Sequence, residues 1–260
     1  MRALVLLAII FLGLQACGRY RAAAIAPDPP AVVLSQQLLE RQRAGQPVEE
    51  VVAQLAALSP NELLAELGTR EEQLAFWINI YNGTIQYLLN QQPELWERRS
   101  NLFGGKRMTI AGELLSPEMI EHGIIRGTEG KLGLGFIPQL FPNKFERTFQ
   151  IRKGDPRVHF ALNCGAIDCP PVEIYDPATI QERLDYRTRR YLEQHSTISA
   201  DGELLTTTPL FSWFRGDFAT YGGIDDFLVK FDILTASNKG IKRKYKNYDW
   251  TLALDVYATD

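Results

Sequence analysis

The chain has 260 residues, with 28 Lys and Arg against 31 Asp and Glu, so its formal net charge is −3. Nucleic-acid-binding proteins usually show a basic excess, and this balance argues against that class. Hydrophobic residues make up 45% of the chain and aromatic residues 10%, which is enough to bury one sizeable core. We therefore expect one globular domain.

The N-terminus has the pattern of an export signal. Arg2 precedes an apolar run at residues 3–14, which is too short to cross a hydrocarbon core of about 30 Å as a helix. The run ends in Leu-Gln-Ala-Cys-Gly, which resembles a bacterial lipobox, although Gln15 departs from the usual small residue. We expect lipid attachment at Cys17, with simple cleavage and an uncleaved signal anchor as the alternatives.

These signals predict a signal peptide at residues 1–16, a lipid tether at 17–30 and a single globular domain at 31–260. Export and lipidation would place the protein in the bacterial cell envelope, as a lipoprotein that faces the periplasm from the outer membrane. The expected partners are the membrane, through the lipid, and a peptide-like or small-molecule ligand, but no nucleic acid. The oligomeric state does not follow from the sequence.

Helices are expected to dominate the first third of the domain. Ser59 and Thr69 each lie three residues before a glutamate, which is the pattern of a capping box at a helix start. The second start opens a helix predicted over residues 70–90. Further helices are predicted over 176–194 and over 217–232, the latter interrupted by a glycine pair.

The expected strands are short and come later. Asp201 and Gly202 are typical of a tight hairpin turn between two of them. Together the elements predict an α+β fold, with N-terminal helices packed on a small, mainly antiparallel sheet. The predicted strands are 107–110, 158–163, 197–199, 203–207 and 248–254.

Two amides lie on the predicted helix over 70–90. Asn82 occupies a position on the apolar stripe of this helix, and Asn79 lies three residues before it, so both side chains can project toward one polar region. A buried amide needs hydrogen-bond partners. The amides either fix the path of a neighbouring loop or face a functional pocket.

A second candidate group lies on a capped helix that begins near Ser116. Glu118, His122 and Arg126 follow one another at four-residue steps, so a helix brings them onto one face. The spacing fits a row of interacting side chains, and it fits a solvated helix face equally well.

The central candidate segment is 155–171. Alternation along the predicted strand 158–163 places His159 opposite the apolar residues, toward a cleft, where an imidazole can transfer protons or bind a metal. Cys164 follows at the strand end. Five extended residues separate the α-carbons of His159 and Cys164 by about 16 Å, so a base for this thiol must come from elsewhere. His122 is the stronger candidate and His195 the weaker.

The cysteine pair leaves several interpretations open. After export, Cys164 and Cys169 can form one disulfide, which is either a structural staple or a redox couple. Alternatively, Cys164 is a single reactive thiol. With His122 and His159 the two sulfurs would also make a zinc ligand set, but no spacing requires it. We expect no metal and no cofactor.

Several blocks of the sequence resemble the domain-of-unknown-function family 547. The resemblance covers residues 70–254 and implies a single α+β domain with one site. It implies Asn82, Glu121, His122, Arg126, Arg157, His159 and Cys164 as site residues. The blocks are 77–83, 120–126, 155–171, 212–218 and 248–250.

The leading functional hypothesis is a cysteine-dependent enzyme, by analogy with papain-like and transglutaminase-like enzymes. Cys164 is its expected nucleophile, His122 or His159 the base, and Asn82 the orienting amide or oxyanion donor. The substrate-binding candidates are Asn79, Glu121, Arg126 and Arg157. The alternatives are a ligand-binding or scaffold lipoprotein with a structural disulfide, and a thiol oxidoreductase.

Overall fold

The computed structural model describes residues 27–127, 129–130 and 133–259. The predicted signal peptide, Cys17 and most of the predicted tether lie outside these residues. Within them, no helix is long and apolar enough to cross a bilayer. The helical part comprises α1 (Pro30–Arg43), α2 (Glu49–Ala57), α3 (Pro60–Glu66), α4 (Arg70–Gln91), η1 (Pro93–Arg98), α5 (Arg99–Gly104), η2 (Met119–Ile125) and α6 (Lys144–Phe149).

Helix α4 is the centre of this part. Its predicted capping box is confirmed, because the Thr69 hydroxyl accepts a bond from the Glu72 N–H and the Glu72 carboxylate accepts one from the Thr69 N–H. Every residue from 74 to 86 is buried, because α1, η1, η2 and α7 pack around the helix. Gly83 permits the close approach of α1, since a Cβ there would lie 2.5 Å from Leu38 Cδ2.

The predicted strand over 158–163 is wrong. The 3-10 helix η3 (Pro156–Phe160) covers the first three of its residues, and no strand follows in the rest. The Asp155 side chain caps it by accepting a bond from the Arg157 N–H, and Pro156 occupies a first position that needs no N–H donor. The alternating apolar residues face two cores and not one sheet face, since Val158 packs in one hydrophobic cluster and Phe160 in another.

Two small sheets complete the α+β fold, which confirms the predicted class. Strands β1 (Met108–Ile110) and β2 (Glu113–Leu115) pair antiparallel. The predicted hairpin is also present, with β3 (Thr197–Ile198) antiparallel to β4 (Leu204–Thr207). The strand β5 (Lys242–Tyr245), which the sequence did not predict, pairs parallel with β4.

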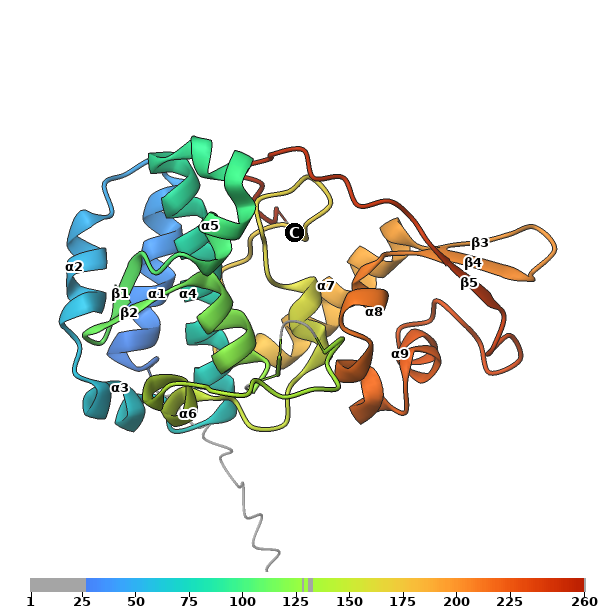
Figure 1. Ribbon diagram of the computed structural model, residues 1–260, viewed down its shortest axis with the longest axis horizontal. Helices are drawn as coiled ribbons and strands as arrows, with labels where there is room; N and C mark the ends of the chain where they lie inside the picture. Colours follow the sequence, from blue (N-terminus) through green and yellow to red (C-terminus); the bar gives the residue numbers. More distant parts are fainter. Residues whose placement is uncertain (1–26, 128, 131–132, 260) are drawn as a thin grey trace, which may run out of the picture.

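The C-terminal half has its own aromatic core around Phe160. Figure 1 shows this half beside the helical part, with the last segment of the chain running back from β5 across to the helices. The predicted strand over 248–254 is wrong, because this returning segment makes only isolated bridges, at Ala166–Leu252 and Val172–Tyr257. The remaining helices are α7 (Ile180–His195), α8 (Leu210–Trp213), η4 (Arg215–Tyr221) and α9 (Ile224–Lys230).

Candidate functional site

A cavity of about 270 Å³ lies where the helical part meets α8 and the returning C-terminal segment. One wall is aromatic, and its Trp213 and Trp250 rings stack with their centroids 5.9 Å apart. Tyr248 packs against both rings, at 5.1 and 4.8 Å. The lining side chains with titratable or sulfur chemistry are Tyr81, Glu118, Glu121, His122, His159, Cys164 and Tyr248.

A disulfide forms part of the cavity wall. Cys164 and Cys169 are bonded to each other, and their α-carbons are 6.2 Å apart. The structure therefore holds Cys164 in the oxidised form and not as a free thiol. Cys164 is half-buried and lines the cavity, whereas Cys169 is only 8% exposed. Of the two bonded cysteines, Cys164 is therefore the one that lines the cavity.

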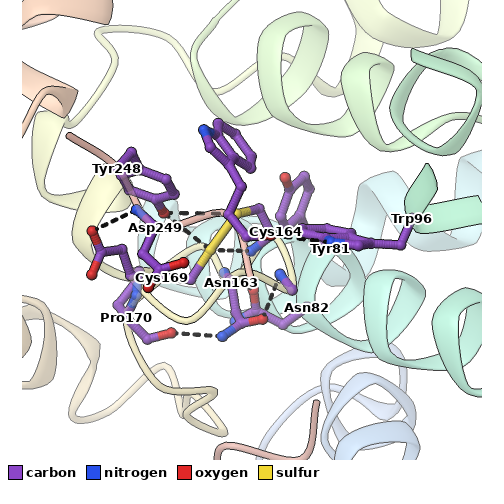
Figure 2. Close-up of a disulfide and its surroundings, with 12 residues drawn as sticks. Tyr81, Asn82, Trp96, Asn163, Cys164, Cys169, Pro170, Tyr248 and Asp249 are labelled. Carbon is purple, nitrogen blue, oxygen red and sulfur yellow. Dashed lines mark hydrogen bonds between the residues drawn. A yellow bond between two sulfur atoms is a disulfide. The ribbon is translucent and has the colours of Figure 1, made fainter. Parts of the chain in front are cut away.

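The buried sulfur is surrounded by hydrogen-bond donors. Figure 2 shows Tyr248 beside the disulfide, where its hydroxyl donates to Cys169 Sγ at 3.2 Å. The Cys164 backbone N–H donates to the same sulfur at 3.0 Å. Burial raises the pKa of Tyr248, so its hydroxyl keeps the proton that it donates. Two donors aimed at one sulfur would stabilise a thiolate at Cys169.

A buried charge network supports the opposite wall. Arg126 donates to both carboxylate oxygens of Asp217, at 2.7 and 2.8 Å, and His159 Nε2 lies 2.7 Å from Asp217 Oδ2. Burial alone would raise the pKa of Asp217, but the hydrogen bonds and charges of Arg126 and His159 outweigh it and hold this pKa well below its usual range. The Phe214 ring stacks on His159 at 3.9 Å and lies 4.8 Å from the Arg126 guanidinium carbon.

The network also determines the proton position on His122. Arg126 Nη1 lies 2.8 Å from His122 Nδ1. A guanidinium group can only donate, so Nδ1 is an acceptor and the neutral ring carries its proton on Nε2. Glu121 Oε1 lies farther from this nitrogen, at 3.7 Å, so the Arg126 contact decides the tautomer. In this form His122 has no unshared nitrogen lone pair with which to act as a base.

Glu121 faces the cavity with a defined partner. The Tyr81 hydroxyl donates to Glu121 Oε2 at 3.2 Å, and burial together with the nearby Glu121 charge raises the pKa of Tyr81. The structure therefore brings Glu121 and His122 to one cavity with His159 and Cys164. Arg126 lies behind it and contacts His122.

The two predicted amides lie elsewhere. Asn82 is fully buried, donates to the Ala161 carbonyl at 3.0 Å and accepts from the Asn163 N–H at 2.8 Å. Asn79 makes the equivalent pair of bonds with the backbone of Tyr175, at 2.9 and 2.8 Å. Both amides therefore hold chain segments against α4, and neither lines the cavity.

Arg157 is likewise engaged in structural contacts. It donates to Asp155 through Nε at 3.0 Å and Nη2 at 2.6 Å, and to Asp185 through Nη1 at 2.7 Å. Its pKa is raised because the hydrogen bonds and charge of Asp155 outweigh the opposing effect of burial. Arg157 does not line the cavity, and its contacts join η3 to α7.

Sequence reasoning missed several site residues. Asp217 links Arg126 to His159, and Tyr248 contacts both sulfurs of the disulfide. The only signal for them was that 212–218 and 248–250 are blocks of the family resemblance. Nothing in their local pattern shows that they meet residues about 60 to 90 positions away in the chain.

The two histidines and two cysteines that were considered as zinc ligands do not form a metal site. Both candidate sulfurs are joined in the disulfide, and His159 contacts Asp217. Across residues 27–127, 129–130 and 133–259, no group of three or more His, Cys, Asp or Glu side chains is placed to hold a metal ion.

The geometry thus defines an α+β domain with a disulfide in the wall of an aromatic cavity. Residues 64–192 match the family model described as "Protein of unknown function, DUF547", which supports a domain of this family over that part of the chain. The match ends before α8, and the aromatic wall of the cavity therefore lies beyond it. The searches of curated proteins and of solved structures returned no match.

Proposed function

We propose that this protein is a cysteine-dependent enzyme that exchanges disulfides with a thiol substrate bound in the aromatic cavity. The asymmetry of the disulfide carries the proposal, because Cys164 lines the cavity while Cys169 accepts two hydrogen bonds behind it. Export, lipid attachment at Cys17 and a periplasm-facing position in the cell envelope belong to the same proposal. Disulfides persist in such oxidising compartments.

The proposed reaction begins with attack of a substrate thiolate on Cys164 Sγ. A substrate–Cys164 disulfide forms, the Cys164–Cys169 bond breaks, and Cys169 leaves as a thiolate. The Cys164 N–H and the Tyr248 hydroxyl stabilise this leaving group. A second substrate thiolate attacks the substrate sulfur of the mixed disulfide, which releases a substrate disulfide and a Cys164 thiolate. Two substrate thiols have then lost two electrons to the protein, and a second disulfide compound must reoxidise the pair.

Two observations favour disulfide exchange over a hydrolase mechanism in which cysteine is the nucleophile. A hydrolase needs a free thiol and a base beside it, whereas the structure holds the disulfide and gives His122 a proton on Nε2. The hydrogen-bonding side chain at Cys164 Sγ is Tyr248, at 3.7 Å. Exchange needs no protein base when the substrate thiol arrives ionised.

The test is reduction of the folded full chain by 2-mercaptoethanol, followed by mass spectrometry. We expect the Cys164–Cys169 disulfide to open without denaturant. Tyr248→Phe should slow the opening by about tenfold, because it removes a donor to a charged leaving group. The control variant Tyr245→Phe should react like the parent protein, because Tyr245 lies on β5 and does not line the cavity.

Single-cysteine variants test the asymmetry. Cys169→Ser should form a mixed disulfide with 2-hydroxyethyl disulfide at Cys164, at least about tenfold faster than Cys164→Ser does at Cys169, because only Cys164 lines the cavity. A disulfide that resists mild reductant until the protein unfolds would refute the exchange function.

A second candidate is a ligand-binding protein in which the disulfide is a loop staple. The observation that favours it is a pair of side-chain hydrogen bonds that holds the same loop in addition to the disulfide. The Asn163 side chain accepts from the Gly165 N–H at 3.0 Å and donates to the Pro170 carbonyl at 2.8 Å. Under this alternative, Cys164→Ala would leave ligand binding intact, and the loss would be confined to stability.

A further inference from the structure

The loop before α6 exposes an unusual amount of apolar surface. Five large apolar side chains occur within residues 134–141, and Leu140 and Phe141 are 78% and 89% exposed. The other three are Leu134, Phe136 and Ile137, at 48%, 62% and 58%. Contiguous exposed apolar patches of this kind mark surfaces that are covered in use.

The loop is a defined structure. Glu129 and Pro138 form an antiparallel bridge, and the Gly130 N–H donates to the Ile137 carbonyl at 2.8 Å. The Gly216 N–H, from η4, donates to the Leu134 carbonyl at 2.7 Å. These bonds engage backbone groups of the loop while its apolar side chains point to solvent.

Exposed cations flank the apolar side chains. Lys144 and Arg147 lie on α6, immediately after the loop, and Arg215 precedes the glycine that bonds to Leu134. Phe136 and Arg215 line one surface depression together. Apolar side chains with basic residues beside them fit the interface of a bilayer that contains anionic lipid, because the cations meet headgroups while the apolar groups enter the acyl boundary.

The start of the described chain lies on the same edge. The Ala31 N–H donates to Glu66 on α3 at 2.7 Å, and Arg70, just beyond, donates to the carbonyls of Arg152 and Lys153, which follow α6. Figure 1 places α3 and α6 along one edge of the molecule. Residues 18–30, the expected link to a lipid on Cys17, can span at most about 45 Å. A chain tethered in this way would keep that edge near the membrane.

We propose that residues 134–141 insert into the interface of an anionic lipid bilayer. The side chains of Phe136, Ile137, Leu140 and Phe141 enter the acyl boundary, and Lys144 and Arg215 contact headgroups. This membrane contact is separate from the proposed exchange reaction and does not depend on it.

Hydrogen–deuterium exchange on the full chain tests the contact locally, so membrane binding through the N-terminal apolar run does not obscure it. Vesicles of phosphatidylcholine with phosphatidylglycerol should slow amide exchange in 133–142 at least about fivefold, and vesicles of phosphatidylcholine alone should slow it less. Leu140→Ser with Phe141→Ser should raise the lipid concentration for half-maximal slowing at least about tenfold. The control pair Ile167→Ser and Val256→Ser, which are 55% and 45% exposed and lie outside both the loop and α3, should not.

Charge variants separate the anionic contact from apolar burial. Lys144→Gln with Arg215→Gln should raise the required lipid concentration by about tenfold or more, whereas the exposed pair Arg98→Gln and Lys106→Gln should have little effect. Slowing that appears without vesicles when the protein is concentrated would assign the patch to a second copy of the chain. That result, or no slowing with either kind of vesicle, would overturn the proposal.

Discussion

The substitution Asp217→Asn tests the charge network behind the cavity. The side chains of Arg126 and Asp217 are 2% and 9% exposed, so removing one charge leaves the other buried without its counter-charge. An amide oxygen cannot accept both Arg126 N–H groups in the same geometry, and the new NH₂ group opposes these donors. We expect the free energy of unfolding at pH 7 to fall by about 3–5 kcal/mol, measured by urea denaturation with circular dichroism.

A matched control comes from a surface ion pair. Arg190 and Glu193 are 47% and 44% exposed, so Glu193→Gln should change the free energy of unfolding by no more than about 0.5 kcal/mol. A loss below about 1 kcal/mol for Asp217→Asn would refute the assignment of Asp217 as the centre of the network.

The pH dependence of the Asp217 effect has a definite sign. The pKa of Asp217 is below its ordinary value of 3.8 in the folded protein, so the unfolded chain takes up the proton first as the pH falls. The stabilisation is therefore complete above about pH 5 and declines below about pH 4. The difference in the free energy of unfolding between the parent protein and Asp217→Asn should become smaller over that range. A difference that grows in acid would contradict the argument.

Two further substitutions separate structural roles from chemical ones. Asn82→Leu should lower the free energy of unfolding by about 2–4 kcal/mol, because it leaves two buried backbone groups unpaired. The thiol-exchange rate of its folded fraction should stay unchanged, and a rate loss at full stability would instead support a catalytic amide. Burial, with a smaller contribution from Lys246, lowers the pKa of His195 to about 4, so the unfolded state binds the proton first below about pH 6.5. The free energy of unfolding of the parent protein should therefore fall as the pH drops from 6.5 to 4. His195→Asn should reduce this fall by about 1–2 kcal/mol, after allowance for the partial exposure of His195. An equal dependence of the free energy of unfolding on pH in both proteins would contradict this.

Local patterns predicted the elements that local interactions determine. The capping boxes at Ser59 and Thr69 are both present, because the bonds join residues three apart whatever the rest of the chain does. The hairpin turn at Asp201 and Gly202 has the same local origin. The strand predicted over 158–163 was wrong, because the apolar alternation there arises from packing against two cores and only resembles the pattern of a strand.

The buried amides and arginines show what could not be predicted about the site, namely the partners of each polar side chain. Burial and polarity marked Asn82 and Arg157 as residues that need partners, but they did not show whether those partners are backbone groups or a ligand. The fold gives both residues structural partners. The spacing from His122 to Arg126 fitted both a row of interacting side chains and a solvated helix face. The contact between these two residues appears only in the structure, where Arg126 caps the π-helix η2.

The sequence by itself determined the α+β class, the central helix, the family resemblance and the concentration of chemistry around Cys164. These follow from local periodicity, capping and residue type. Only the tertiary structure placed Asp217 between Arg126 and His159, brought Tyr248 to the disulfide and made Cys164 the cysteine that lines the cavity. The reason is physical: the path of a chain through two cores decides which distant segments meet, and no local pattern records that path.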